Sequence, residues 1–403
     1  EERMSENTYP SVNDLTLEEK ASLTSGGDAW HLQGVEAKGI PGYMITDGPH
    51  GLRKSNSATT GEVDLNNSVP ATCFPPAAGL SSSWNPELIH QVGEAMAEEC
   101  IQEKVAVILG PGVNIKRNPL GGRCFEYWSE DPYLAGHEAV GIVAGVQSKG
   151  VGTSLKHFAA NSQETDRLRI SANISQRALR EIYFPAFEHI VKEAQPWTIM
   201  CAYNCINGVH AAQDRWLLTD VLRDEWGFQG IVMSDWGADH DRVASLNAGL
   251  NLEMPPSYTD DQIVYAARDG RIQPAQLDRM AQGMIDLVNK TRAAMSVENY
   301  RFDIEAHDEV AHQAAVESMV LLKNDDAILP VAGDAKVTVI GEFARTPRYQ
   351  GGGSSHITPT KMTSFLDALT ERGVDAKFAP GFTLDLEPAD PALEAEEIGR
   401  AHV

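Results

Sequence analysis

A series of short apolar runs constrains the fold of this chain more than any other feature. Each run stops at a polar or glycine-rich position, and most give way to a helical pattern. The runs cover residues 43–46, 105–109, 152–155, 197–202, 231–234 and 250–253. Short buried strands that alternate with helices are typical of a parallel sheet. Six or seven such units approach a closed barrel of about 250 residues. We therefore predict an α/β fold with a TIM-like (β/α)8 barrel catalytic domain over residues 1–290.

Two stretches carry clear helix-start signals between these runs. Asn85 followed by Pro86 suits a cap and first turn, which predicts a helix over residues 86–103. Ser175 precedes an amphipathic pattern and is expected to cap a second helix.

The pattern changes after the barrel. Residues 291–306 are irregular and are interpreted as a linker. The remaining segments predict a helix, a buried strand, a glycine-rich loop and a second helix, at residues 307–323, 336–341, 350–355 and 364–372. One strand, one loop and one helix cannot cover both faces of a parallel sheet. We therefore interpret residues 307–403 as the N-terminal part of a second α/β sandwich domain, incomplete in this chain.

Composition excludes several classes of function. With 33 basic and 57 acidic residues the net charge is −24, which opposes nucleic acid and anionic membranes as partners. The chain has neither an apolar stretch of about 20 residues nor a signal-peptide pattern. Five cysteines, which lack metal-site spacing, predict reduced thiols. A cytoplasmic location is expected, and secretion or a periplasmic location remains open.

Asp235 and Trp236 directly follow the apolar run 231–234. In a β/α barrel the polar residue just beyond a strand lies at the active-site mouth. An indole offers a flat face to a sugar ring, and a neighbouring carboxylate can attack an anomeric carbon. This pair indicates a carbohydrate enzyme. The alternative is structural: Asp235 caps the next helix and Trp236 fills the core.

Other strand ends bring polar residues to the same predicted rim. They are Asp47, Lys156, His157 and Tyr203, with Arg123 and Arg167 in nearby loops. Together they supply the dense donors and acceptors that sugar hydroxyls need when they leave water. Each also fits a structural role, such as a turn at Asp47 or an ion pair between Arg123 and Glu126.

Several motifs, taken in order, resemble glycoside hydrolase family 3, and in particular its β-glucosidases. They are Thr-Asp-Gly-Pro-His-Gly-Leu-Arg at 46–53, Gly-Pro-Gly-Val-Asn at 110–114, Gly-Gly-Arg-Cys-Phe-Glu-Tyr-Trp-Ser-Glu-Asp-Pro at 121–132, Lys-His-Phe-Ala-Ala-Asn at 156–161, Met-Cys-Ala-Tyr-Asn at 200–204 and Ser-Asp-Trp at 234–236. The resemblance runs from about residue 13 to the end. It implies that Asp235 is the nucleophile. It also implies a sugar subsite lined by Asp47, Arg123, Lys156, His157, Arg167, Met200, Tyr203 and Trp236, with Ser354 reaching it from the second domain.

The resemblance implies a retaining, exo-acting β-glycosidase, in first place a β-glucosidase that releases terminal β-D-glucose. Its substrate is expected to be a β-linked glucoside or oligosaccharide, and no metal or cofactor is required. Related enzymes carry an acid/base glutamate later in the second domain. No such loop is found before Val403, so the remainder of the same polypeptide, beyond residue 403, is expected to supply it. A homo-oligomer is compatible with the sequence.

Other functions stay open at this point. β-Xylosidase or arabinosidase activity is the nearest alternative, because pocket room around C6 separates these sugars. A sugar-binding protein without turnover is another. A Schiff-base lyase with Lys156 as nucleophile is a third. The N-acetylglucosaminidases of the family use a His-Asp pair on a barrel loop, but Ala-Ala-Asn follows Phe158 here instead of their glycine- and histidine-rich loop.

Overall fold

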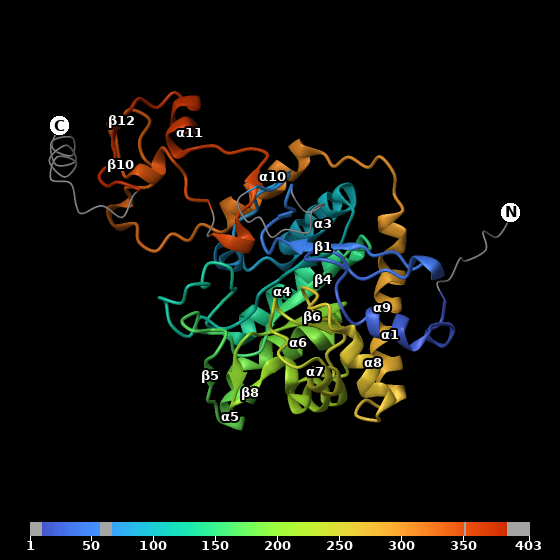
Figure 1. Ribbon diagram of the computed structural model, residues 1–403. Helices are drawn as coiled ribbons and strands as arrows, with labels where there is room; N and C mark the ends of the chain where they lie inside the picture. The colour runs from blue at the N-terminus through green and yellow to red at the C-terminus, as the bar shows by residue number, and fades with distance from the viewer. Residues whose placement is uncertain (1–9, 57–66, 350–351, 385–403) are drawn as a thin grey trace.

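The computed structural model of the protein describes residues 10–56, 67–349 and 352–384 (Figure 1). A parallel five-stranded sheet forms the centre, with strand order β1-β3-β4-β6-β9. The strands are β1 (Met44–Asp47), β3 (Val105–Leu109), β4 (Gly152–Phe158), β6 (Thr198–Cys201) and β9 (Ile231–Met233). Five of the six predicted runs thus form strands in the predicted order. The prediction of an α/β, TIM-like barrel is confirmed.

Single bridges, rather than further strands, complete the ring. Met233 pairs with Leu252 and Glu253 with Ser25, both in parallel. Two antiparallel bridges, Gly26 to Leu32 and His31 to Met44, then return to β1. The predicted strand at 250–253 is therefore reduced to two bridge positions. The sequence reading also missed the N-terminal turn that closes the barrel.

Helices cover the outside of the sheet (Figure 1). They are α1 (Leu17–Ser22), α2 (Ala77–Leu80), α3 (Pro86–Glu103), α4 (Pro132–Ser148), α6 (Pro185–Ala194), α7 (Arg242–Ala248), α8 (Asp260–Arg268) and α9 (Pro274–Met295). The helix predicted at 86–103 is confirmed, and the Asn85 side chain accepts a hydrogen bond from the Leu88 amide as a cap does. Ser175 caps α5 (Gln176–Ala178), but wider π-helical turns at Leu179–Tyr183 separate α5 from α6.

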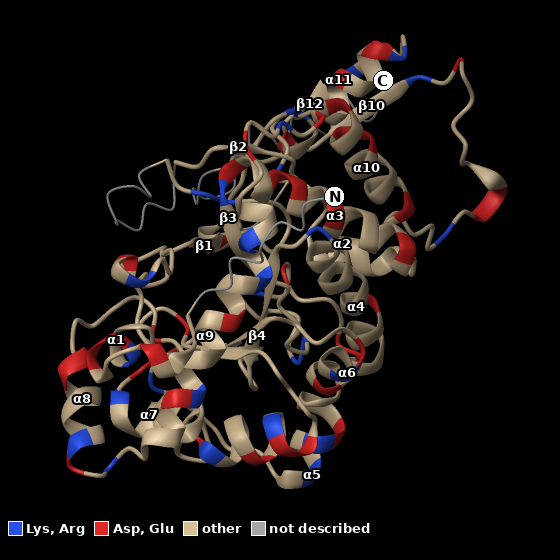
Figure 2. Cartoon of the chain, turned by 90° about the vertical axis from the view of Figure 1, so that its right-hand side faces the viewer, with Lys and Arg blue, Asp and Glu red and all other residues tan. Residues whose placement is uncertain are grey.

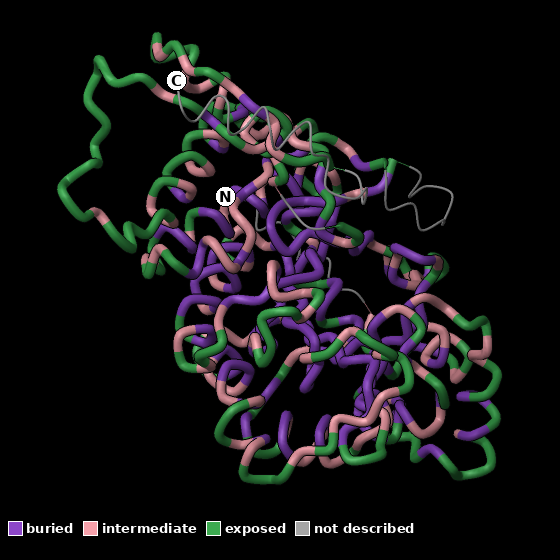
Figure 3. Tube along the Cα trace, turned by 90° about the vertical axis from the view of Figure 1, so that its left-hand side faces the viewer, coloured by how far each residue is buried: buried purple, intermediate pink, exposed green. Residues whose placement is uncertain are grey.

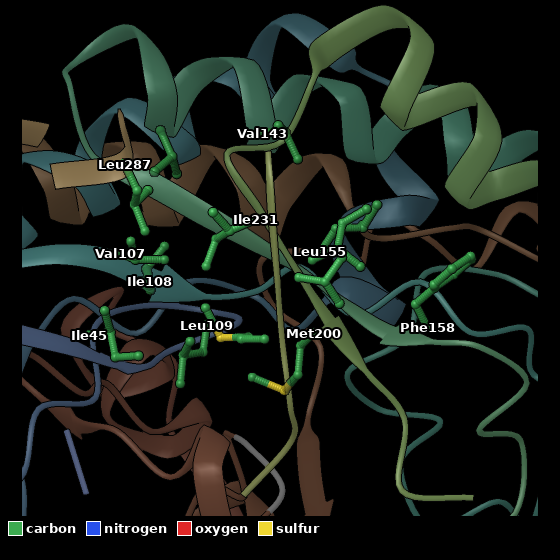
Figure 4. Packing of buried hydrophobic residues seen from close by; sticks show 14 of the residues in the cluster. Ile45, Val107, Ile108, Leu109, Val143, Leu155, Phe158, Met200, Ile231 and Leu287 are labelled. Atoms are coloured by element: carbon green, nitrogen blue, oxygen red, sulfur yellow. The ribbon is translucent and has the colours of Figure 1, made fainter. Parts of the chain in front are cut away.

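The core lies inside the barrel and under its helices (Figure 4). Ile45, Val107, Leu155 and Ile231 come from four of the five strands and are almost fully buried. Strands buried on both faces read as continuous apolar runs, which is why these runs were visible in the sequence. Figure 2 shows the charged residues concentrated on outward-facing helices such as α6 and α8.

The chain beyond α9 is built differently. It contains α10 (Ile304–Glu317), β10 (Val337–Ile340), β11 (Thr358–Pro359), α11 (Phe365–Glu371) and β12 (Ala376–Ala379). β10 pairs in parallel with β12, a strand that the sequence reading missed. β11 pairs with β2 (Pro70–Ala71), which belongs to the barrel side.

Two sequence predictions in this region are wrong in detail. The helix predicted over 307–323 ends at Glu317, and the apolar residues that follow, such as Leu322, are exposed. The strand predicted as buried exists, but Ile340 is 40% exposed and only Val339 is buried. Figure 3 shows the contrast between the purple barrel and the long green segment that follows α10. The two-domain division itself stays a prediction.

Helix α10 docks on α3 through a buried histidine. The Nδ1 atom of His307 lies 2.9 Å from Oε1 of Glu99, and its Nε2 lies 3.2 Å from Oε2 of Glu98. The ring of Phe302 stacks on His307 with the ring centroids 4.8 Å apart. This contact ties the start of the C-terminal part to the barrel.

Candidate active site

A cavity of about 500 Å³ opens at the carboxyl ends of the barrel strands. All the residues predicted for the site line it: Asp47, Arg123, Lys156, His157, Arg167, Met200, Tyr203, Asp235, Trp236 and Ser354. Asp47 ends β1, Lys156 and His157 lie in β4, and Met200 lies in β6. The backbone therefore brings together residues that are up to 307 positions apart, counted from Asp47 to Ser354.

Asp235 lies two residues beyond β9 and faces this cavity. Its Oδ1 accepts a hydrogen bond from the Trp236 amide at 2.8 Å. Its Oδ2 has no hydrogen-bond partner among the described residues. The next helix, α7, is capped by Asp241 instead. Asp235 is thus not the cap that the structural alternative required.

Burial raises the pKa of Asp235, and Arg123, the Trp236 amide, Lys156 and Tyr203 oppose that shift. The basic neighbours act in the direction expected from the sequence, since they favour the carboxylate. The cost of removing the charge from water nevertheless outweighs them, so the net shift is upward. The Tyr203 hydroxyl donates to the main-chain oxygen of Trp236 at 3.0 Å.

Positive charge gathers around this carboxylate. Arg123 forms an ion pair with Glu126, as the structural alternative suggested, but it also lines the cavity. Burial lowers the pKa of Lys156, which is only 2% exposed. The guanidinium carbon of Arg167 lies 4.7 Å from the ring centre of Tyr203, and its Nη1 donates to Glu164 at 2.8 Å.

His157 is held rigidly beside Asp235. Its backbone amide donates to Asn114 Oδ1 and its carbonyl accepts from Asn114 Nδ2, both at 2.9 Å. Burial, with Arg123, Lys156 and Arg167, lowers the pKa of His157 well below its ordinary value. The imidazole is therefore neutral near pH 7.

Asp47 combines a turn with a place in the cavity. Its Oδ2 lies 3.2 Å from Nη1 of Arg53. Gly48 follows with φ of +142°, and a Cβ there would lie 2.2 Å from the carbonyl oxygen of Gly51. Only glycine fits this close approach. The tight turn leaves Asp47 at the cavity wall.

The sequence reading missed several lining residues, namely Trp30, Gly122, Phe125, Glu126, Glu164, Gly352 and Gly353. Trp30 packs on Trp236 with ring centroids 5.5 Å apart. Trp30 lies in the N-terminal turn, which the sequence pattern did not predict. From the sequence, Glu126 was predicted only as an ion-pair partner of Arg123, and Glu164 was not predicted to line the site.

Residues 352–354 reach the cavity because the next residues are anchored on the barrel. The Thr358 amide donates to Ser68 Oγ at 3.2 Å, and the Thr360 amide donates to the Ala71 carbonyl at 2.9 Å. Ile357 is fully buried. Ser354 is thereby placed at the cavity wall, while residues 350–351 of the predicted loop lie outside the described residues.

Within the described ranges, no group of three His, Cys, Asp or Glu side chains is arranged to hold a metal ion. A search of the same ranges finds no helix with the length and apolar character that crossing a bilayer requires.

Comparison with known families decides the lineage. Residues 52–287 match the N-terminal domain of glycosyl hydrolase family 3, and residues 319–399 match its C-terminal domain. The chain belongs to glycosyl hydrolase family 3. The resemblance drawn from its motifs is therefore confirmed.

Relatives within family 3 carry different names. The chain is 85% identical to an exo-α-(1→6)-L-arabinopyranosidase of Bifidobacterium breve, over 99% of this chain and 54% of that protein. It is 50% identical to thermostable β-glucosidase B of Acetivibrio thermocellus, over 95% of this chain and 51% of that protein. The crystal structure of a β-glucosidase from Bifidobacterium adolescentis matches with a TM-score of 0.92 and 88% identity, over 97% of this chain and 56% of that one. The chain thus spans about half the length of these relatives.

Proposed function

We propose that this chain carries the nucleophile and the sugar-binding site of a retaining, exo-acting β-glycosidase that releases terminal β-D-glucose. One observation carries the proposal: the buried carboxylate of Asp235, whose Oδ2 has no hydrogen-bond partner among the described residues, borders a cavity lined by aromatic and charged side chains. Trp30 and Trp236 supply apolar surface for a sugar ring, while Asp47, Lys156 and Arg167 supply partners for its hydroxyls.

The reaction runs in two displacements. Asp235 Oδ2 forms a bond to the anomeric carbon as the bond to the leaving oxygen breaks, and an acid protonates that oxygen. Water then attacks the same carbon, gives its proton to the conjugate base, and releases Asp235. Arg123 and Lys156 stabilise the carboxylate form that the first step requires and the charge that returns in the second.

The acid is proposed to come from beyond residue 403, in the remainder of the same polypeptide. The carboxyl groups that line the cavity within the described ranges, Asp235 apart, are each paired with an arginine: Asp47 with Arg53, Glu126 with Arg123 and Glu164 with Arg167. A general acid needs a proton near neutral pH. At Glu126 the neighbouring cations, Arg123 first, outweigh burial and lower the pKa of that carboxyl, whereas at Asp47 burial outweighs Lys156 and Arg53 and raises its pKa. The 85% identical relative is longer than this chain, which covers 54% of it, and this supports a source of the acid outside the 403 residues.

α-L-Arabinopyranosidase activity is a second candidate, favoured by the 85% identical relative. An α-L-arabinopyranoside presents the same configuration at C1, C2 and C3 as a β-D-glucoside. It differs by an axial hydroxyl at C4 and by the absence of the C6 hydroxymethyl group. Attack by Asp235 from the same side is therefore compatible with either sugar, and the choice depends on contacts to C4 and C5.

Two measurements on the full-length gene product test the proposal. NMR during hydrolysis of 4-nitrophenyl β-D-glucopyranoside should detect β-glucose first, since two displacements retain configuration. Early formation of α-glucose would contradict the retaining mechanism. The ratio of kcat/KM for this substrate to that for 4-nitrophenyl α-L-arabinopyranoside then ranks the two candidates. A ratio well below one would replace β-glucosidase by arabinopyranosidase.

A further inference from the structure

A line of three buried or half-buried side chains ends on the ring of His157. Glu164 Oε1 lies 3.1 Å from Nδ2 of Asn161. The same Nδ2 lies 3.1 Å from the Tyr127 hydroxyl, and that hydroxyl lies 3.0 Å from Nδ1 of His157. Asn161, Tyr127 and His157 are at most 3% exposed. His157 lines the cavity, but the mechanism above uses neither its ring nor the groups behind it.

The carboxylate of Glu164 sets the donor and the acceptor in each hydrogen bond of the line. Glu164 bonds Arg167 through Oε2, and an ionised carboxylate can only accept. Asn161 must therefore turn its NH2 group toward Glu164, and its second N–H points at the Tyr127 oxygen. Tyr127 accepts there, so its single hydrogen is available for His157 Nδ1.

The opposite arrangement would leave the hydrogen of the Tyr127 hydroxyl without an acceptor among the described residues. If Nδ1 of His157 carried the proton, it would donate to the Tyr127 oxygen, and the buried Tyr127 hydrogen would lose the only acceptor that the described residues offer it. Burial raises the pKa of Tyr127, so the hydroxyl keeps its hydrogen. Within the described ranges, each end of the line is thus satisfied only when Tyr127 donates to His157.

The far side of the imidazole favours the same form. Nε2 of His157 lies 3.7 Å from Oδ2 of Asp235, the oxygen without a partner in the described chain. A bare Nε2 would turn its lone pair toward that oxygen. A protonated Nε2 instead places a positive hydrogen there.

We propose that Glu164, Asn161 and Tyr127 are positioning residues that fix His157 as the neutral Nε2–H tautomer. His157 then presents a hydrogen-bond donor to Asp235 and to the sugar hydroxyl that lies between them. This inference deepens the proposed function and rests on it for the sugar. A ligand oxygen at this place must accept from His157, so it can donate its own hydrogen to a carboxylate.

Glu164 has a second task that affects the choice of variant. Its Oε2 holds Arg167, whose guanidinium lies over the Tyr203 ring. A change at Glu164 would disturb both. Tyr127→Phe removes only the hydroxyl and keeps the ring, which meets the His157 ring edge-on with centroids 6.1 Å apart.

The test compares wild type, Tyr127→Phe and a matched control, Tyr183→Phe, in the full-length gene product. The Tyr183 hydroxyl also has a hydrogen-bond partner, Nη1 of Arg117 at 3.3 Å, but it lies outside the active-site cavity. Nitrogen-15 NMR of histidine-labelled protein reads the tautomer directly, and His157→Gln assigns the signal. We expect a protonated Nε2 and a bare Nδ1 in wild type and in Tyr183→Phe. In Tyr127→Phe we expect a mixture of tautomers, with kcat/KM about tenfold lower.

A wild-type proton on Nδ1, or an unchanged tautomer in Tyr127→Phe, would overturn the inference. Asn161→Leu is a second variant that keeps side-chain size and removes the donor to Tyr127. It should show the same shift in smaller amount, and an NMR signal identical to wild type would also count against the relay. The tautomer is read without turnover, so an inactive enzyme would defeat the proposed function and leave this result standing.

Discussion

The barrel and the C-terminal region, residues 319–384, differ in how far they bury their apolar side chains, and two phenylalanines show this difference. Phe158 ends β4, is fully buried, and packs on Phe184, Phe187 and Trp226. Phe365 begins α11 and is 57% exposed. The barrel thus buries its own apolar surface, whereas the C-terminal region leaves much of its apolar surface in water. Among the described residues of the C-terminal region, only 352–354 line the cavity, so the barrel supplies most of its wall.

The largest expected effect is chemical and lies in the barrel. Asp235→Asn keeps the shape of the side chain and removes the nucleophilic charge. We expect kcat for 4-nitrophenyl β-D-glucopyranoside to fall by about four orders of magnitude or more, as when other covalent nucleophiles are removed. Glucose should still bind, because the wall of the cavity is intact.

Asp220→Asn, on the outer helical segment Trp216–Glu225, is the control and should leave kcat unchanged. Activity of Asp235→Asn within tenfold of wild type would contradict the assignment of the nucleophile.

A paired core substitution tests the structural side of the comparison. Phe158→Ala should lower the free energy of unfolding by about 3–5 kcal/mol, because it opens a cavity in a packed core. Phe365→Ala should change it by less than about 0.5 kcal/mol, since the ring is mostly in water already. Urea unfolding of both variants measures the difference. Equal losses would mean that the two regions are stabilised alike.

The contact that joins the two regions should depend on pH. Burial lowers the pKa of His307, but Glu99 and Glu98 outweigh it and raise the pKa above 6.5. The imidazolium stabilises the fold fully below pH 6.5, and this contribution is lost as the pH rises through the raised pKa. His307→Gln should therefore cost about 1–2 kcal/mol near pH 6 and less at pH 9.

Thermal unfolding of wild type and His307→Gln across this pH range measures the effect. The same groups surround the ring in both proteins, namely Glu98 and Glu99, with Lys149 and Tyr300 bonded to Glu98. A difference that grows as the pH rises would contradict the charged contact.

The smallest expected effect belongs to the C-terminal region. Ser354→Ala removes the only side chain, as opposed to glycine, that this region adds to the described cavity wall. We expect KM to rise about twofold to fivefold with kcat nearly unchanged, since the substitution removes one hydroxyl that is proposed to bind the sugar at the wall of the cavity. A larger fall in kcat than in affinity would show that the C-terminal region also takes part in the chemical step, and not only in binding of the sugar.

The sequence was most informative where burial is continuous. Val105–Leu109 is a strand at the predicted residues, because a strand covered on both faces has no polar position to blur it. The carboxyl ends of parallel strands meet at one end of the barrel, so polar residues there are expected to lie close together. Asp47, Lys156 and Asp235 do line one cavity.

Sequence reasoning failed where tertiary contacts override local pattern. Trp30 lies in a turn that meets the sheet through isolated bridges, and no periodic signal marks it. The sequence suggested the ion pair between Arg123 and Glu126, but only the fold shows that Glu126 and Glu164 also line the cavity. The apolar segment after Glu317 has a helical composition but no surface in the described chain to pack on, so its side chains are exposed.

Mass spectrometry of a trapped intermediate tests the central claim most directly. Incubation of the full-length gene product with an activated 2-deoxy-2-fluoro-β-D-glucoside should slow release of the ester enough to isolate it. We predict one added sugar, carried by the peptide that contains Asp235 and absent from Asp235→Asn. A label on any other residue, or an equal label on the Asn variant, would contradict the account.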